Sequence, residues 1–227
     1  MFNKLLSALP VNVYQRLSPY FTEVSLVQGQ ILHQPGEIIQ SVYFPHQASV
    51  SIVVSLSDKS TVEVAVIGYE GLVGLPIILG AKSSTNYSIV QISGKAIKIE
   101  SQILVEEFNK GKELQNLLLL YTQAQLNQIS QIATCQSHHI IEQRLARWLL
   151  LVSHCTKKSK LPLTQKLISM MLGVRRASIT EAAISLQKAE IITYSRGQIV
   201  ILDRTKLESA ACECYSKIIQ EYNRLLD

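Results

Sequence analysis

The stretch LTQKLISMMLGVRRASITEAAISLQKAEIITYSRGQIVI, residues 163–201, decides the fold of this 227-residue chain. Thr164 can cap a short helix, and Gly173 can end it. A second amphipathic helix is expected from about Arg176 to Ala189. Two helices joined by a tight turn that contains glycine are typical of a helix-turn-helix, whose second helix enters the major groove of DNA.

Two β-type runs follow this helix pair at residues 191–194 and 198–201, on either side of Ser195-Arg196-Gly197. A glycine-containing turn between two such runs predicts a hairpin with Arg196 near its tip. A hairpin placed directly after a helix-turn-helix is a wing. The buried face of the second helix is expected to be Ile179, Ala182, Ala183 and Leu186, with Ala177, Thr180, Glu181, Ile184 and Lys188 facing outward.

One residue in this segment breaks a local rule. Arg175 stands at the expected N-cap of the second helix, where Ser, Thr, Asp or Asn would serve better. Together with Arg176 it also opposes the helix dipole. A DNA phosphate would relieve both conflicts, so the misfit favours a functional role.

The charge of the chain is unevenly distributed. Residues 1–136 hold 8 Lys and Arg against 9 Asp and Glu, whereas residues 137–227 hold 14 against 8. This difference indicates a polyanionic partner for the second half alone, and a solvated basic surface is the alternative interpretation.

The first half has the texture of a β-rich domain. After one or two short helices in residues 1–20, runs rich in Val, Ile, Tyr and Ser alternate with turn residues. This density of turns predicts an antiparallel roll rather than βαβ units. The expected strands are 42–44, 49–56, 61–67, 87–92 and 96–99.

A long helix is expected after Gly111, because residues 112–161 contain neither Gly nor Pro. Its first part carries one apolar stripe, Leu114, Leu118 and Tyr121, for docking on its own domain. A second stripe would form a dimer seam with another copy of the chain, unless a monomer buries the helix on two sides. This second stripe is Leu119, Leu126, Ile129 and Ala133.

Helix propensity falls around residues 134–137, and Ser137 can cap a new helix whose buried face includes Leu145 and Trp148. We therefore expect an α+β protein with a jelly-roll-like antiparallel β-roll at residues 1–111. A long central dimerisation helix follows at residues 112–136. A winged helix-turn-helix occupies residues 137–227.

The cysteines and histidines give no metal-site spacing. Cys212-Glu213-Cys214 has no second cysteine pair at zinc-finger distance, and Cys135 and Cys155 stand apart. The expected state of all four thiols is reduced and structural. We expect His33 and His46 in turns and the other histidines, His138, His139 and His154, beside one helix. Neither a metal nor another cofactor is predicted.

The composition excludes other classes of protein. An apolar content of 47% is enough for a core and excludes intrinsic disorder. The longest apolar runs fall short of the roughly 18–20 residues that cross a bilayer, and residues 1–10 predict a surface helix rather than a signal peptide. Neither a P-loop nor a G-x-S-x-G elbow is present, so an enzyme is not expected.

Motifs along most of the chain follow a single family pattern. The second half contributes EQRLARWL at 142–149 and LGVRRAS at 172–178, and the first half contributes GYEGLVG at 68–74 with shorter matches at 29–30, 35–37 and 42–44. This set resembles the Crp–Fnr superfamily of bacterial transcription regulators. The resemblance implies a cyclic-nucleotide-binding-type roll, a dimerising central helix and a winged helix that binds a palindromic operator.

The resemblance also implies roles for individual residues. Arg176 matches the recognition-helix arginine that reads a guanine, and Thr164, Lys166 and Ser178 match positions that contact the DNA backbone. Ala177 and Glu181 depart from the residues of many members, so the operator of those members cannot be assumed. The expected DNA-binding set is Thr164, Lys166, Arg175, Arg176, Ser178, Thr180, Glu181 and Arg196.

The sensor half departs further from the family. Its cyclic-nucleotide binders carry Gly-Glu-Leu and a later arginine, which align here with Gly74-Leu75-Pro76 and with the region of Asn86. Both charged contacts are missing, and a buried phosphodiester would lack its counter-charge. The N-terminal cysteines of the iron–sulfur members are also absent, so the effector is unknown.

The sequence therefore predicts a cytoplasmic homodimer that binds double-stranded DNA and regulates transcription, with RNA polymerase as a further partner and no membrane association. The alternative is a ligand-sensing module that acts on a protein partner without touching DNA.

Overall fold

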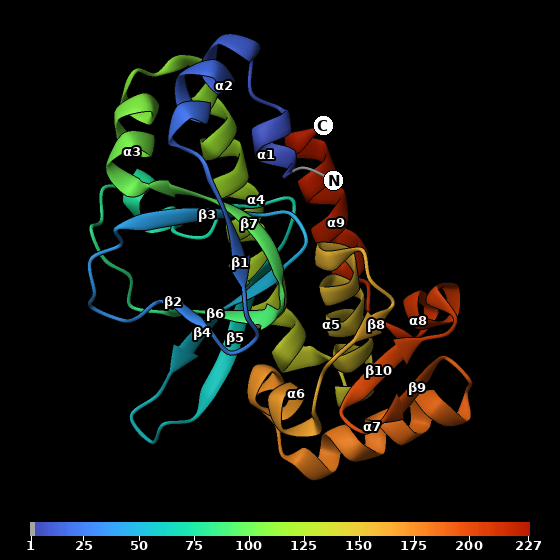
Figure 1. Ribbon diagram of the computed structural model, residues 1–227. Helices are drawn as coiled ribbons and strands as arrows, with labels where there is room; N and C mark the ends of the chain where they lie inside the picture. Colours follow the sequence, from blue (N-terminus) through green and yellow to red (C-terminus); the bar gives the residue numbers. More distant parts are fainter. Residues whose placement is uncertain (1–2) are drawn as a thin grey trace.

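The computed structural model describes residues 3–227, which run from a β-rich N-terminal half into a largely helical C-terminal half (Figure 1). Seven strands form two antiparallel sheets in the first half. The first sheet has the order β1-β7-β3, with β1 Thr22–Leu26, β3 Ser41–Pro45 and β7 Gly94–Glu100. The second has the order β2-β6-β4-β5, with β2 Ile31–His33, β4 Ser49–Ser55, β5 Thr61–Ile67 and β6 Tyr87–Ile92.

The two sheets pack as a roll. Leu26 and Ala96 of one sheet share a buried apolar cluster with Val50 and Val90 of the other. The five strands predicted from their β-branched runs are present, and the antiparallel arrangement is confirmed. Strands β1 and β2 are absent from the predictions, and their partners β7 and β6 lie far along the chain.

Short helices close the roll. They are α1 Lys4–Ser7, α2 Val11–Leu17, the 3₁₀ helices η1 Ser18–Tyr20 and η2 Leu75–Leu79, and α3 Ser101–Asn109. Asn3 caps α1, and its side-chain amide donates to the backbone oxygens of Pro45 and Gly71, each at 2.8 Å. The helix expected at the start of the chain is present, and its Leu5 and Leu6 are buried while Ser7 is exposed. Met1 and Phe2 lie outside the described residues.

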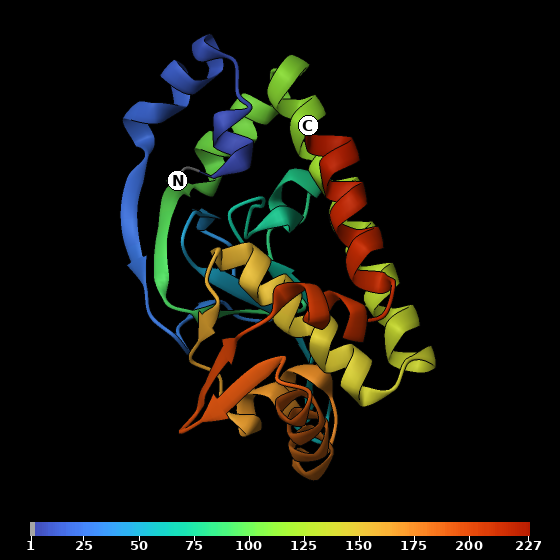
Figure 2. The same cartoon turned by 90° about the vertical axis from the view of Figure 1, so that its right-hand side faces the viewer.

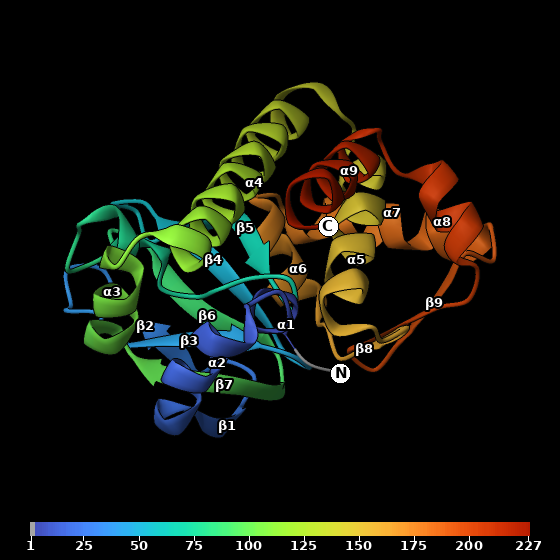
Figure 3. The ribbon, with the colours of Figure 1, turned by 90° about the horizontal axis from the view of Figure 1, so that it is seen from above.

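The central helix α4 runs from Lys112 to His138 and carries the predicted docking stripe, which is buried. The Tyr121 hydroxyl donates to the backbone oxygen of Leu72 at 3.1 Å. A C-terminal helix absent from the predictions, α9 Cys214–Leu226, lies along α4 (Figures 2 and 3). Tyr222 of α9 meets Tyr121 edge-on, with ring centroids 6.4 Å apart.

The second stripe of α4 is covered by neither the roll nor α9. Leu119 and Leu126 are 48% and 54% exposed. Ala133 is exposed and Ile129 partly exposed.

The expected helix start at Ser137 is wrong. The Ser137 hydroxyl donates to the backbone oxygen of Ala133 at 3.3 Å, inside the last turn of α4. The break comes two residues later, where His139 and Ile140 are extended. Serine is tolerated inside a helix because its hydroxyl can donate to the backbone oxygen four residues earlier.

The C-terminal half forms a winged helix-turn-helix below the roll in Figure 1. Its elements are α5 Ile141–Thr156, β8 Lys160–Leu161, α6 Gln165–Leu172, α7 Arg176–Lys188, β9 Ile192–Ser195, β10 Gln198–Ile201 and α8 Arg204–Ala210. Among residues 3–227, no helix combines the length and hydrophobicity that crossing a membrane requires.

Helix α5 attaches this half to the roll through a buried polar contact. The Trp148 indole donates to a Glu63 carboxylate oxygen at 2.8 Å, and Ser51 and Gln91 bond to the other oxygen at 2.5 and 3.1 Å. Burial raises the pKa of Glu63 to about 7, although these hydrogen bonds and the charge of Arg147 oppose the rise.

This raised pKa predicts a pH-dependent stability. Because the folded protein holds the Glu63 proton more tightly than the unfolded chain, the contribution is complete below about pH 4.5 and is lost as the pH rises through about 7. The free energy of unfolding should fall by on the order of 2 kcal/mol more in the wild type than in Glu63→Gln between pH 5 and 8. Denaturant titrations of both proteins test this, and parallel pH profiles would contradict it.

Candidate nucleic-acid interface

The first helix of the motif has the boundaries that its sequence predicts. The Thr164 hydroxyl accepts the backbone N–H of Leu167 at 3.2 Å and so caps α6. Gly173 ends the helix with φ of 62°, a left-handed conformation that glycine adopts without strain. Gly173, Val174 and Arg175 alone separate α6 from α7.

The second helix begins without a side-chain cap, as expected. Arg175 occupies the N-cap, and its side chain accepts no backbone N–H. The predicted apolar face is buried against α5, whereas Ala177, Glu181, Ile184 and Lys188 are exposed. The long side of α7 that the sequence assigns to DNA is therefore free of intramolecular packing.

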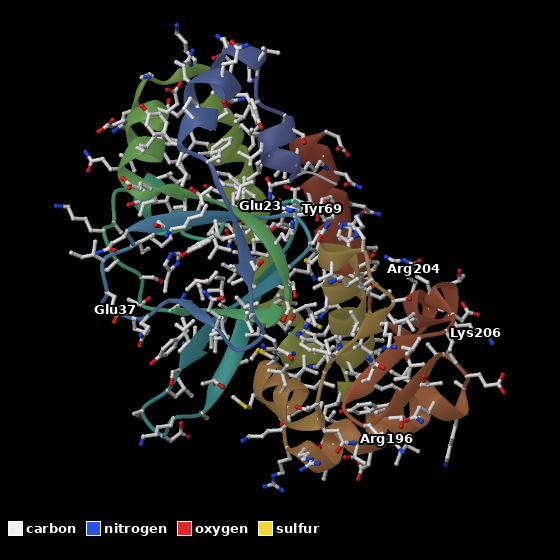
Figure 4. All side chains as sticks on the ribbon, viewed as in Figure 1. Glu23, Glu37, Tyr69, Arg196, Arg204 and Lys206 are labelled. Atoms are coloured by element: carbon white, nitrogen blue, oxygen red, sulfur yellow. The ribbon has the colours of Figure 1, made fainter. Side chains whose placement is uncertain are left out.

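The wing is a tight hairpin. β9 and β10 pair from Ile192 with Ile201 to Ser195 with Gln198, which leaves Arg196 and Gly197 as the two turn residues. Both have positive φ, 49° and 75°, as a two-residue hairpin turn requires. Arg196 consequently projects at the tip, on the same side of the molecule as α7 (Figure 4).

A groove of about 340 Å³ lies between the wing and the starts of both helices. The Arg176 Nε donates to the Gln165 Oε1 at 3.2 Å within it, so Gln165 orients the guanidinium. Gln165 and Tyr194 are absent from the predicted site, since neither carries a charge or belongs to a motif. The lining is Thr164, Gln165, Arg176, Tyr194, Ser195, Arg196 and Gly197.

Four cations on this surface have no counter-charge. Among residues 3–227, no carboxylate lies within 4.0 Å of the charged groups of Lys166, Arg175, Arg176 or Arg196. All four residues are exposed or partly exposed. Uncompensated positive charge that is held on one rigid surface suits a polyanion.

Other basic residues of the same half are engaged elsewhere. The Lys157 ammonium donates to the Tyr69 hydroxyl at 2.6 Å and lies 4.0 Å from the ring centroid. Lys158 reaches backbone oxygens of the roll. Lys157 and Lys158 therefore belong to the contact between the two halves and not to the unpaired basic surface.

The remaining predicted residues occupy distinct places. Arg175 lies away from the wing, in a cavity of about 760 Å³ that Lys59 of the β4–β5 hairpin also lines. The Thr180 hydroxyl donates to the backbone oxygen of Arg176 at 3.1 Å. Ser178 is partly exposed and Glu181 fully exposed one turn apart on α7.

A family model of the Crp-like helix-turn-helix domain matches residues 143–210. Residues 143–210 therefore belong to a Crp-like helix-turn-helix domain. Over the whole chain, the likeness to solved structures is one of fold. The domain match agrees with the predicted helix-turn-helix of the second half.

Several solved structures share the Crp–Fnr fold at low identity. FixK2 from Bradyrhizobium japonicum is 18% identical with a TM-score of 0.71, covering 85% of this chain and 98% of its own. A putative regulator of the crp/fnr family from Eubacterium rectale is 16% identical with a TM-score of 0.70, covering 91% and 96%. The c-di-GMP-responsive regulator CLP of Xanthomonas campestris is 14% identical with a TM-score of 0.65, covering 86% and 100%. A sequence search of curated proteins finds no match.

The β-roll is closely packed around Gly74, where the sequence departs from the cyclic-nucleotide-binding motif. Gly74 has φ of 110°, and a Cβ atom there would lie 2.7 Å from Val42 and 3.4 Å from His33. Leu75 begins η2 behind it, and Asn86 lies before β6. Neither aligned residue brings a charge to this turn.

The position expected for His33 is wrong, because it lies in β2 and is buried rather than in a turn. Its Nε2 donates to the Ser41 backbone oxygen at 2.8 Å, and its Nδ1 accepts from the Ser88 hydroxyl at 3.3 Å. Burial lowers the pKa of this imidazole despite the bond to Ser41. With both nitrogens engaged, His33 is a neutral core residue.

We expect cyclic AMP and cyclic GMP to bind negligibly, because Leu75 and Asn86 cannot replace the ribose acceptor and the phosphate counter-charge. Isothermal titration calorimetry at micromolar protein should give no saturable heat with either nucleotide. A saturable isotherm at one nucleotide per chain would contradict the expectation.

Proposed function

We propose that the chain is a sequence-specific transcription regulator that binds a palindromic operator as a homodimer and controls it through a still unidentified effector of the roll. The observation that carries the proposal is the set of four uncompensated cations, Lys166, Arg175, Arg176 and Arg196, on a Crp-like helix-turn-helix with its wing. Unpaired cations on a helix-turn-helix and its wing suit the phosphates that border a major groove.

The residues divide between reading bases and contacting the backbone. Arg176 lies at the start of α7, where a guanidinium can reach guanine O6 and N7 together. Lys166 and Arg175 meet phosphates, and Arg196 extends this contact from the wing. Thr164 and Ser178 add contacts to the DNA backbone. Thr180 and Glu181 face the major groove one turn further along α7.

The proposed dimer forms through the uncovered stripe of α4. Leu119, Leu126, Ile129 and Ala133 follow heptad-like spacing, and burial of exposed leucines at a seam is favourable by about 25 cal/mol per Å². A two-fold axis along this seam would present two copies of α7 to successive major grooves, about 34 Å apart.

We propose the same division of labour along the chain that the sequence predicts, with residues 1–111 as sensor, 112–136 as dimerisation helix and 137–227 as DNA-binding domain. The protein then acts in the cytoplasm, where it meets DNA and RNA polymerase.

Arg176→Ala should weaken operator binding by about 1–3 kcal/mol per half-site and relax the preference at one base pair, because it removes a bidentate base contact. Lys166→Ala should weaken binding to all sequences equally. It should also lower the salt slope by about one unit per half-site, because one phosphate is then no longer neutralised. Fluorescence anisotropy with a footprinted operator and a scrambled duplex at several salt concentrations measures both effects.

Lys82→Ala is the matched control, since it removes an exposed cation of the sensor half. It should change neither affinity nor slope. An equal loss of affinity for both duplexes with Arg176→Ala would show that this residue contacts phosphate instead. If the wild-type protein shows no salt-dependent affinity for any duplex, the result would favour the alternative function, a ligand-sensing module that acts on a protein partner without DNA.

Replacing Leu126 and Ile129 together by glutamate should give monomers and weaken operator binding, because the charges would face each other at the seam. Sedimentation velocity at micromolar protein concentration measures the oligomeric state. Val11→Glu, at another exposed apolar position (73% exposed), should leave the dimer intact. A wild-type protein that sediments as a monomer would contradict the seam.

A further inference from the structure

Three cysteines and one histidine meet where α4 ends and α9 begins. Cys135 lies near the end of α4, and His139 follows its last residue. Cys212 and Cys214 lie at the junction of α8 and α9. One ligand atom from each residue, three Sγ and one imidazole nitrogen, falls within 4.8 Å of all the others.

The distances within this cluster suit a tetrahedral ion. The Sγ atoms of Cys135 and Cys212 are 3.4 Å apart, and the Cys214 Sγ lies 3.5 Å from the His139 Nδ1. Zinc bonds of about 2.3 Å to sulfur and about 2.0 Å to nitrogen imply ligand separations of about 3.8 Å and about 3.5 Å at tetrahedral angles. For these two pairs, the ligand atoms therefore need shifts of only a few tenths of an ångström.

The groups around the cluster orient its ligands. The His139 Nε2, the nitrogen that faces away from the thiols, lies 3.2 Å from the Glu213 carboxylate. A carboxylate that holds the second nitrogen of a histidine is the usual support of a zinc-binding imidazole. The Gln131 amide donates to the Cys214 Sγ at 3.2 Å, as expected around a thiolate.

The surroundings are closed and positively charged. All three cysteines are buried and His139 is partly exposed, and the four ligands together would fill the tetrahedral coordination of a bound zinc ion. Arg144 and Arg147 of α5 are buried near enough for their charges to interact with the cluster. The Nε of both arginines and the Nη1 of Arg147 have no hydrogen-bond partner among the described residues. An ion with three thiolates carries one net negative charge and would balance such a cation.

We propose that Cys135, His139, Cys212 and Cys214 form a structural zinc site that clamps the start of α9 to the end of α4. Thiolate and imidazole ligands in a closed four-coordinate cage select Zn²⁺ over the oxygen-seeking Mg²⁺ and Ca²⁺. This proposal replaces the expectation of reduced structural thiols for three of the four cysteines, and it is independent of the proposed function.

Cobalt substitution of the full-length chain tests the site. The reduced, chelator-treated protein should take up one Co²⁺ per chain with the intense visible bands of tetrahedral coordination and a thiolate charge-transfer band. Zn²⁺ should displace the Co²⁺ stoichiometrically. Cys135→Ser and Cys212→Ser should lose the thiolate-rich tetrahedral spectrum, whereas Cys155→Ser, which changes the one cysteine outside the cluster, should keep it.

Glu213→Gln provides a variant that leaves all ligands in place, because Glu213 has an exposed side chain. It should lower zinc affinity about 10-fold in competition with a chromophoric chelator, because the supporting carboxylate is removed. Zinc should also raise the thermal midpoint of the wild type and not that of Cys212→Ser.

Two outcomes would overturn the proposal. One is reduced wild-type protein, folded by circular dichroism, that shows no tetrahedral Co²⁺ spectrum at stoichiometric metal. The other is a Cys135–Cys212 disulfide in protein purified without reductant, detected by mass spectrometry, whose reduction restores no metal binding.

Discussion

The hydrogen bond from Trp148 to Glu63 is the interaction on which the arrangement of the two halves depends. It joins α5, the first helix of the DNA-binding half, to the edge of the second sheet in a fully buried site. A close backbone approach supports this contact near the C-terminal end of α5. A Cβ atom on Gly68 would lie only 2.5 Å from the Cα of Cys155. Side chain and backbone together leave α5 little freedom to slide on the roll.

Fixing α5 fixes the surfaces that reach outward. α7 packs on α5 through its alanine-rich face, and so its opposite side points away from the roll. The turn between α6 and α7 meets the β4–β5 hairpin, where a Cβ atom on Gly173 would lie 3.2 Å from Val62. Arg175 consequently belongs to the cavity shared with the roll and Arg176 to the groove shared with the wing, although the two residues are adjacent in sequence.

Caps, turn residues and apolar periodicity were sufficient to predict the helices and the hairpin that contain them. Thr164, Gly173 and the Arg196-Gly197 turn specify their own backbone, and the period of Ile179 to Leu186 specifies a helix face. The helix start predicted at Ser137 was wrong because a serine hydroxyl can either cap a new helix or donate to a backbone oxygen inside the preceding one. The helix boundary is set by the extended residues that follow Ser137. The pairing of β1 with β7 joins Thr22 to Lys98, a register that no nearby residue encodes.

The same limit applies to the metal cluster. Cys135 and His139 are four residues apart, as one helix face requires, but their partners lie more than 70 residues later and reach them only because α9 packs along α4. Docking of Tyr222 on Tyr121 brings the two segments together, and neither aromatic residue signals a metal. Chemistry that depends on a helix pair is invisible until the pair is known.

Arg147 connects the two buried polar sites. Its charge acts both on the Glu63 carboxyl at the roll and on the Cys135 thiol beneath α4. A guanidinium stays protonated when buried, so a neighbouring anion must balance it. If Glu63 alone supplied that anion, the charge of Arg147 would favour an ionised carboxylate in a site where burial favours the neutral form. A negatively charged zinc–thiolate cluster relieves this conflict, because it balances Arg147 from the opposite side. The electrostatics of α5 thus link the position of α9 to the contact between α5 and the roll.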